Sequence, residues 1–322
     1  MGLKIMQTAH YVPSKVVTND DLAAMMDTSD EWISSRTGIK QRHVVRDEQT
    51  SDLAAKVAEK LLAKSGHEAE DIDFIIVATM SPDYLTPATA AIVQGKIGAK
   101  KAWAFDVNAA CSGFIYALAL ADKLLAGKYR LGLVIGAEVL SKLVDWQERS
   151  TAVLFGDGAG GVLVEAKDKS SIVAEDLATF GQDGGTLTAG YQPLESAFAQ
   201  DQVDKHRHFF EMDGRAVYRF ATHEVPNSLT RVLAKADWSL DDVSWFILHQ
   251  ANGRIISAIA QHLGQDESKF LNNVAKFGNT SAASIPILLD EAVSSGQIKS
   301  GEKLLLSGFG GGLTAGSLAI VY

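Results

Sequence analysis

The chain has 322 residues, 47% of them hydrophobic and 21% charged, and its net charge of −9 at pH 7 makes it acidic. This composition excludes disordered and fibrous classes and predicts a globular protein of one or two domains. The negative net charge argues against a nucleic-acid partner, so an anionic ligand needs a local basic patch. The single cysteine excludes a disulfide framework. No apolar stretch approaches the roughly 20 residues of a membrane span, so we expect no membrane partner. Both features predict a cytoplasmic protein.

Short apolar runs rich in β-branched residues alternate with helical segments along the chain. This alternation predicts an α/β fold with mostly buried strands. In chain order, the predicted strands lie at 73–79, 131–136, 162–164, 245–248 and 303–307.

The order of these elements repeats. In each half, a strand precedes a helix that begins beside small residues, and a second strand and a glycine-rich segment follow. We therefore expect two duplicated halves, 1–170 with the cysteine and 171–322 with a histidine and an asparagine of interest. The polar, weakly patterned stretch 167–205 is the expected join.

Cys111 stands at the head of a predicted helix. The apolar run 114–125 follows it and stops at Gly127, which indicates a buried central helix. Unpaired N–H groups and the helix dipole at such a start can lower a thiol pKa from about 8.5 to about 3.5–7.5. We interpret Cys111 as a nucleophile, and the alternative is an inert, packed cysteine.

His249 and Asn279 supply the partners that a cysteine nucleophile needs. His249 ends the predicted strand 245–248, at the carboxyl edge where α/β sheets place ligands, and Asn279 follows Gly278. Alone, the histidine fits a hydrogen-bonded core position and the asparagine fits a helix N-cap. Together with Cys111 they predict a catalytic trio.

Two glycine-rich segments have different interpretations. Gly310, Gly312 and Ala315 match the dinucleotide-binding fingerprint, but only seven residues follow Ala315 (322 − 315), too few for a βαβ unit. The glycines at 310–312 instead allow a backbone N–H to approach a reacting carbonyl, as in an oxyanion hole. The glycines at 156–158 are typical of a tight turn.

Specific motifs extend along most of the chain. They lie at 28–33, 36–39, 108–114, 155–160, 249–252, 278–284 and 309–312. With these motifs the sequence resembles the type III β-ketoacyl-acyl-carrier-protein synthases of the thiolase superfamily. The resemblance implies a thiolase-like, five-layered αβαβα fold from two duplicated halves, a homodimer, and an active site of Cys111, His249 and Asn279.

The resemblance also implies the chemistry, a decarboxylative condensation that starts fatty acid synthesis. Cys111 takes the acyl group of acetyl-CoA or a slightly larger acyl-CoA, while the N–H groups of Cys111 and Gly311 stabilise the oxyanion. His249 and Asn279 then bind the thioester carbonyl of malonyl-acyl carrier protein as CO2 leaves, and Phe309 offers the malonyl carboxylate an apolar neighbour. Both thioesters are substrates, and no metal or other cofactor is implied.

Binding residues follow from the same resemblance. Trp32 and Arg149 would sandwich the CoA adenine, and Arg219 and Arg254 would dock the acidic carrier protein. Thr86 would reach the partner subunit's acyl pocket, where a threonine leaves room for primers longer than acetyl. Further contacts to CoA are expected from Thr28, Arg36, Gly214, Asn252 and Arg254.

Three other functions agree less well with the sequence. A thiol protease has the same order of cysteine, histidine and asparagine, but its typical cysteine surroundings are absent. A type III polyketide synthase or hydroxymethylglutaryl-CoA synthase typically has a longer chain. A catalytically inactive dimeric scaffold is disfavoured because all three active-site residues are present.

Overall fold

The computed structural model describes residues 1–194, 196–198 and 208–322, and two main sheets organise them. The first sheet has the order β1 (Gly2–Tyr11), β7 (Gly158–Lys167), β6 (Leu131–Glu138), β4 (Phe74–Ala78) and β5 (Trp103–Val107). The second has the order β11 (Trp245–Leu248), β12 (Lys303–Gly310), β13 (Thr314–Val321) and β8 (Ile172–Thr179). Two short ribbons pair β2 (Lys15–Thr18) with β3 (Gln41–Val44) and β9 (Leu187–Thr188) with β10 (Glu211–Met212).

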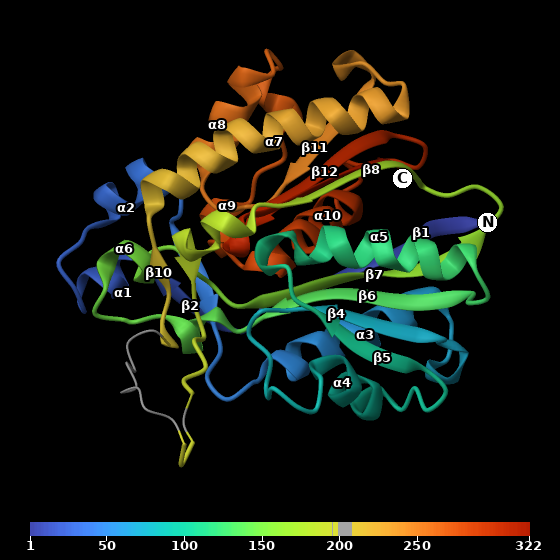
Figure 1. Cartoon of the computed structure of the whole chain (residues 1–322), viewed down its shortest axis with the longest axis horizontal. Coiled ribbons are helices and arrows are strands. Elements are labelled where there is room, and N and C mark those ends of the chain that lie inside the picture. The colour runs from blue at the N-terminus through green and yellow to red at the C-terminus, as the bar shows by residue number, and fades with distance from the viewer. Residues whose placement is uncertain (195, 199–207) are drawn as a thin grey trace.

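Helices separate and cover the sheets in five layers (Figure 1). The outer face of the first sheet packs on α3 (Thr50–Ser65) and α4 (Thr89–Ile97), and the second sheet packs on α7 (Gly214–Ala236) and α8 (Gly253–His262). Between the sheets lie α5 (Gly113–Ala126) and α10 (Ser284–Ser294). The thiolase-like αβαβα arrangement expected from the sequence is confirmed.

Shorter helices occupy the end of the molecule away from the chain termini. In Figure 1, α1 (Asn19–Ala23), α2 (Asp30–Thr37) and α6 (Arg149–Ala152) lie at the left, and both termini lie at the right. A fourth short helix, α9 (Val274–Phe277), lies nearer the centre. Among the described helices, none combines the length and the apolar character that crossing a membrane requires.

The predicted central helix and strands are present. The helix predicted after Cys111 is α5, whose buried apolar side chains fill the space between the two sheets. The five predicted strands correspond to β4, β6, β7, β11 and β12. The stretch 167–205 is more than a connection between the halves, because its described part contains β8, an edge strand that pairs with β13. The residues of β8 are only partly buried, so the sequence lacks the apolar run that marks the other strands. Residues 195 and 199–205 of that stretch lie outside the described residues.

The two halves repeat one design down to a single loop. The orders β1-β7-β6-β4 and β8-β13-β12-β11 have the same pattern of parallel and antiparallel neighbours. In the first half, the Asn108 side chain accepts the N–H of Ala110, whose φ is 45°. In the second half, Asn279 accepts the N–H of Ser281, whose φ is 48°. These loops lead into α5 and α10, so the duplication places two equivalent, strained turns at the centre of the molecule.

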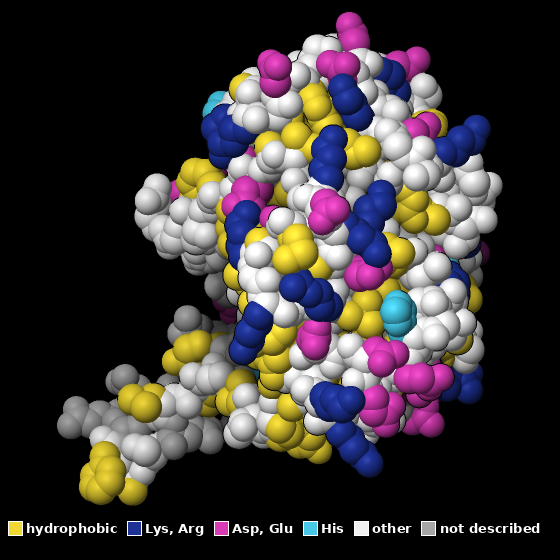
Figure 2. All heavy atoms as spheres, turned by 90° about the vertical axis from the view of Figure 1, so that its right-hand side faces the viewer, with side chains coloured by type: hydrophobic (Ala, Val, Ile, Leu, Met, Phe, Trp, Pro, Cys, Tyr) yellow, Lys and Arg dark blue, Asp and Glu magenta, His cyan; other side chains and the backbone are white. Residues whose placement is uncertain are grey.

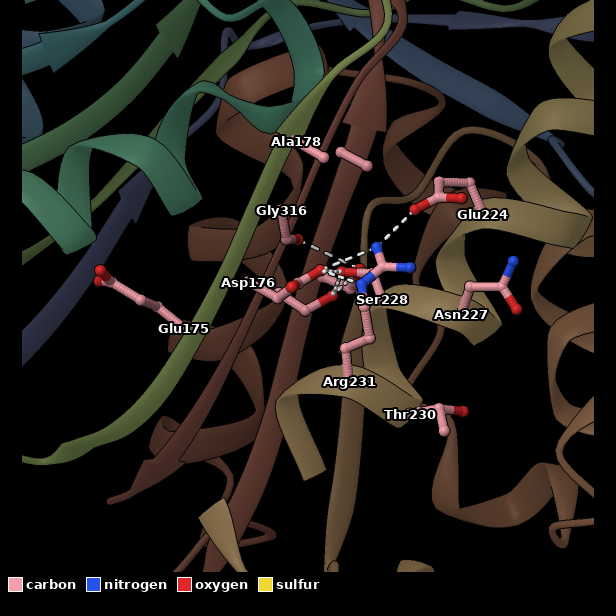
Figure 3. Close-up of polar contacts among 12 residues, drawn as sticks. Glu175, Asp176, Ala178, Glu224, Asn227, Ser228, Thr230, Arg231 and Gly316 are labelled. Atoms are coloured by element: carbon pink, nitrogen blue, oxygen red, sulfur yellow. Dashed lines mark hydrogen bonds and ion pairs between the residues drawn. The ribbon is translucent and has the colours of Figure 1, made fainter. Parts of the chain in front are cut away.

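A polar cluster around the buried Asp176 attaches α7 to the second sheet (Figure 3). Asp176 of β8 accepts hydrogen bonds from Ser228 at 2.9 Å, from Arg231 at 2.9 and 3.0 Å, and from Lys235 at 3.0 Å. The Ser228 hydroxyl also meets Ser317 of β13 at 2.8 Å. Because a buried carboxylate left without these donors would be costly, the cluster fixes α7 on the sheet and with it the start of α7, which borders the functional site described next.

Candidate active site

A cavity of about 1090 Å³ is lined by residues of both halves. Of the residues singled out in the sequence, Thr28, Thr86 and Arg149 do not line it. It brings together Trp32, Arg36, Cys111, Gly214, Arg219, His249, Asn252, Arg254, Asn279, Phe309 and Gly311. Residues that are far apart in the sequence therefore meet in one cavity.

Cys111 lies in a tight turn held from both halves. The turn is η2 (Ala110–Ser112), between β5 and α5, and Ala110 takes a left-handed φ of 45° to form it. Ser112 donates to the Thr314 carbonyl at 3.2 Å, and the Thr314 hydroxyl donates to Ser112 at 3.0 Å. The side chain of Cys111 is buried, with 6% exposed, so the sulfur has a fixed position at the start of α5.

The glycine segment after β12 lies directly against the sulfur. A Cβ atom on Gly310 would lie 2.9 Å from the Cys111 Sγ and 2.7 Å from its Cβ, so only a glycine lets the strand come this close. The backbone N–H groups of Cys111 and of Gly311, the first residue of η9 (Gly311–Leu313), lie near enough to the sulfur to lower the pKa of the thiol. Two N–H groups beside a nucleophile are the arrangement that stabilises an oxyanion.

The Cys111 thiol has a raised pKa. Burial, the largest cause, and the nearby charge of Glu138 raise it to about 12, against the opposing effect of the Ser281 hydroxyl and the two N–H groups. The sequence-based expectation of a lowered pKa is therefore wrong for this thiol, because its removal from water outweighs the favourable helix start. A thiol with this pKa is protonated at neutral pH, so its reaction requires a group that accepts its proton.

His249 is a neutral hydrogen-bond donor. It follows β11, and its Nδ1 lies 2.7 Å from the Ser284 hydroxyl, which also accepts the Gln250 N–H at 3.4 Å. Because Ser284 accepts that N–H, we assign its own proton to Nδ1, which leaves the imidazole proton on Nε2. Burial lowers the pKa of His249 to about 3, and Phe309 packs edge-on against the ring at 5.2 Å.

Asn279 offers its side-chain amide to the cavity. Its backbone N–H donates to Leu154 and its carbonyl accepts from Gly156, both at 2.9 Å, while its Oδ1 accepts the Ser281 N–H at 2.9 Å. The side-chain nitrogen has no hydrogen-bond partner among the residues that the structure describes, so its protons are available to a ligand. The helix N-cap interpretation is wrong, because α10 begins only at Ser284.

An aromatic platform lies beside the cavity on α2. The Arg149 guanidinium lies 4.7 Å and that of Arg36 4.9 Å from the ring centre of Trp32. Arg149 also donates to the Asp27 carbonyl at 2.6 Å. The buried Thr28 hydroxyl has no partner within the described part of the chain. The indole thus already binds flat cations, and a flat ligand ring can replace one of them.

Exposed arginines give this acidic chain a local basic patch. Arg36, Arg215, Arg219 and Arg254 all line the cavity. Arg215 was missed in the sequence, although its position four residues before Arg219 on a helix places both on one face. Asn252 connects two of these arginines. It caps α8 by accepting the Arg254 N–H at 2.8 Å, and it donates to the Arg36 carbonyl at 3.1 Å. At the opposite end of the molecule, Figure 2 shows acidic and basic side chains interspersed.

The sequence analysis gave no chemical role to three other polar residues, Ser281, which lines the cavity, Ser284, which bonds His249, and Glu138. Ser281 and Ser284 belong to the motif at 278–284, where only Asn279 was given a chemical role. Glu138 ends the buried strand β6 and is fully buried. An acidic residue at the carboxyl end of an apolar strand was the available signal.

Comparison with known proteins agrees with this geometry. Residues 105–181 match the family 3-oxoacyl-[acyl-carrier-protein (ACP)] synthase III, and residues 233–322 match its C-terminal region. A Streptococcus equi subsp. equi protein named beta-ketoacyl-[acyl-carrier-protein] synthase III is 56% identical over 320 residues, 98% of each chain. The chain belongs to this family.

Solved structures agree with the assignment. The 3-oxoacyl-[acyl-carrier-protein] synthase III of Aquifex aeolicus VF5 is 43% identical, covers 100% of both chains and superimposes with a TM-score of 0.93. The Thermus thermophilus enzyme is 42% identical, with 99% of this chain and 98% of that one covered and a TM-score of 0.91. The enzyme is therefore a condensing acyltransferase of fatty acid synthesis, which excludes the thiol protease and the inactive scaffold.

Proposed function

We propose that Cys111, His249 and Asn279 condense a short acyl-CoA with malonyl-acyl carrier protein in two steps. The observation that carries this proposal is that Cys111, His249 and Asn279 line one cavity, with the glycine segment 310–312 directly against the sulfur. In the first step, the Cys111 sulfur attacks the acyl-CoA carbonyl and the N–H groups of Cys111 and Gly311 bind the developing oxyanion. CoA leaves, and the acyl group stays on the sulfur.

The second step uses His249 and Asn279, which line the same cavity as Cys111. The Nε2–H of His249 and the free amide of Asn279 donate to the malonyl thioester carbonyl, where negative charge develops as CO2 leaves. Phe309, packed against the imidazole, gives the departing carboxylate an apolar neighbour. The resulting carbanion attacks the acyl-cysteine and yields 3-ketoacyl-acyl carrier protein. Neither step as written uses a metal or a redox cofactor.

Two variants separate the steps. Cys111→Ala should form no acyl adduct with acetyl-CoA, detected by intact-protein mass spectrometry, yet still release some CO2 from malonyl-acyl carrier protein. His249→Ala should form the adduct but condense about 10²–10³-fold more slowly, the usual loss for one oxyanion donor. Condensation at the normal rate by Cys111→Ala would show that the nucleophile is another residue.

The CoA nucleotide binds at the Trp32 platform in this proposal. Trp32 and Arg149 are in direct contact, so they must separate when an adenine enters between them. One face of the adenine then stacks on the Trp32 indole and the other on the Arg149 guanidinium. Thr28, with its unpartnered hydroxyl, and Arg36 lie on the same segment and supply polar contacts. Gly214, Asn252 and Arg254 line the path from there to Cys111.

The acidic carrier protein docks on the basic patch at the cavity. Arg219 and Arg254 are its proposed contacts, with Arg215 beside them. Arg219→Glu should raise the KM for malonyl-acyl carrier protein, and the effect should shrink as salt rises because ions screen exposed charges. Lys299→Glu, an exposed change near the chain end, serves as the matched control. Equal KM values for both variants at low salt would place the dock elsewhere.

We also propose a homodimer formed through the edge of the first sheet. The edge strand β5 presents Trp103, which is 40% exposed and stacks on Phe105 at 5.0 Å. Tyr84 and Leu85, in the loop before α4, are 63% and 78% exposed. An exposed edge strand with large apolar side chains favours pairing with a second chain. Trp103→Glu should reduce the mass measured by light scattering from that of a dimer to that of a monomer.

The remaining assignments rest on the same dimer and on the duplication. Thr86 is exposed and outside the cavity of its own chain, which is consistent with a place in the partner's acyl pocket. The boundary between the halves is proposed at residue 170, since β7 ends at Lys167 in the first sheet and β8 begins at Ile172 in the second. Cytoplasmic location is proposed from the single, reduced cysteine.

A further inference from the structure

A fully buried arginine has no part in the reaction described so far. Arg42 lies in β3 and is 0% exposed. Its guanidinium donates to the Asn19 side-chain oxygen at 2.8 Å and to the carbonyls of Val153 at 2.7 Å and Val17 at 3.3 Å. Each of these acceptors is a neutral oxygen. Burial lowers the pKa of Arg42 to about 10, so the side chain is still a cation at neutral pH. A buried charge that is paired only with neutral groups is costly, and its position calls for a reason.

Asn19 connects this arginine to the helix that carries the aromatic platform. Its side-chain nitrogen donates to Asp30, the first residue of α2, at 2.8 Å. The same nitrogen donates to the carbonyl of Ile39, just beyond the end of α2, at 2.7 Å. Asn19 is itself buried, with 1% exposed, and an amide has two N–H groups to give. One side chain therefore holds both ends of the helix on which Trp32 lies.

Val153 connects the same arginine to the helix that carries Arg149. It is the C-cap residue of α6, so its carbonyl belongs to the groups that a helix end leaves without a partner inside the helix. Arg42 supplies that partner. Arg149 is the first residue of α6, and its guanidinium lies over the Trp32 ring. The two end nitrogens of one guanidinium thus tie together the helices of Trp32 and Arg149.

We propose that Arg42 is a positioning residue that holds Trp32 and Arg149 in place for the adenine of CoA. A guanidinium is a rigid, planar fork, so its end nitrogens keep their acceptors at a fixed separation. The long Arg149 side chain moves aside when adenine enters, whereas α2 and α6 stay where Arg42 holds them. The site is then formed before CoA arrives, and binding has less ordering to drive. Arg42 does not line the cavity, so it acts only through the two helices.

This inference rests on the proposed CoA site, and its test compares a substrate that has a nucleotide with one that lacks it. Acylation of Cys111 is followed in single turnovers by intact-protein mass spectrometry, with acetyl-CoA and with S-acetyl-N-acetylcysteamine. In Arg42→Met, the acetyl-CoA concentration for half-maximal acylation should rise by about 3–30-fold, the usual range for one stacking contact, while the maximal rate stays within about twofold. Acylation by S-acetyl-N-acetylcysteamine should keep its wild-type rate, because this thioester has no adenine to place.

The choice of variants keeps the test specific. Methionine retains the stem of Arg42, which packs near the catalytic loop, since a Cβ on Gly278 would lie 3.5 Å from the Arg42 Cβ and one on Gly156 3.1 Å from it. Asn19→Ala breaks only the link to α2 and should raise the same concentration, so it decides the question if Arg42→Met folds poorly. Arg130→Met changes an exposed arginine just before β6 and is the matched control, with both thioesters unaffected.

A double variant isolates the platform. In Trp32→Ala the indole is gone, and Arg42 then has no stacking surface to position. Adding Arg42→Met to Trp32→Ala should therefore raise the half-maximal acetyl-CoA concentration no further, as expected for residues that act as a unit. Losses that simply add would contradict the proposal.

Three other results would overturn this role of Arg42. Equal losses with both thioesters would show that Arg42 supports the fold as a whole. Wild-type behaviour of both Arg42→Met and Asn19→Ala toward acetyl-CoA would show that neither residue positions the platform. If Trp32→Ala itself needs no more acetyl-CoA than wild type, the nucleotide binds elsewhere, and the proposed CoA site is wrong together with the role of Arg42.

Discussion

Gly310→Ala tests whether the close approach of β12 sets the position of the nucleophile. The φ of Gly310 is 171°, extended backbone that alanine also adopts, so the effect of the change is purely steric. The new methyl would lie 2.7 Å from the Cys111 Cβ, 2.9 Å from its Sγ and 3.1 Å from its N. Carbon atoms in contact prefer about 3.5–4.0 Å, so Cys111 or the strand must move by roughly 1 Å.

The size of the effect follows from that movement. A misplacement of about 1 Å in an active site costs on the order of 10²-fold in rate, and overpacking of a core costs about 1–3 kcal/mol of stability. We therefore expect kcat/KM to fall by about 10²-fold while the protein still folds with a lower Tm. Both acyl transfer and condensation should fall together, because the sulfur serves both steps.

The assay pairs condensation kinetics with acyl-adduct formation and thermal unfolding. Gly184→Ala is the matched control, since Gly184 also lines the cavity but a Cβ there would meet its nearest neighbours at 3.8 Å, ordinary contact. This control should change kcat/KM by less than about twofold, the range of an unstrained surface change. A Gly310→Ala enzyme with the activity of this control would refute the steric argument.

Three other changes probe the tautomer, the α7 cluster and the primer. Ser284→Ala frees Nδ1 of His249 and should slow condensation by about 10–100-fold while acyl-adduct formation stays normal. Burial raises the pKa of Asp176, but hydrogen bonds from Arg231 outweigh burial and hold this pKa below its ordinary value. The ionised Asp176 therefore stabilises the fold at neutral pH, and this stabilisation is lost in acid. Asp176→Asn should lower the unfolding free energy by about 1.5–3 kcal/mol at neutral pH and should flatten the decline of that free energy in urea titrations at acid pH. Thr86→Phe should reduce kcat/KM for butyryl-CoA relative to acetyl-CoA, since each buried CH2 contributes about 0.8 kcal/mol; an unchanged ratio would place Thr86 outside the pocket.

Local signals in the sequence were sufficient for the α/β class, the duplication and the candidate trio, while the five-layered arrangement followed from the family resemblance. The apolar run after Cys111 predicted α5 to within a residue at each end, because helical periodicity is written in neighbouring residues. The strand before His249 and the glycine before Asn279 marked those two residues in the same way. The repeated order of elements predicted the duplicated fold, since similar stretches of sequence adopt similar structures.

Properties that depend on distant segments were decided only by the tertiary structure. The helix start predicted a low thiol pKa for Cys111, but enclosure by the other half of the molecule removes water and raises it. The strand β6, which ends at Glu138, and η8 (Ser281–Ala283) pack together across more than a hundred residues of sequence. Likewise, Gly310 touches the nucleophile through the approach of the second sheet. Burial and long-range contact are properties of the packed chain, and no local pattern encodes them.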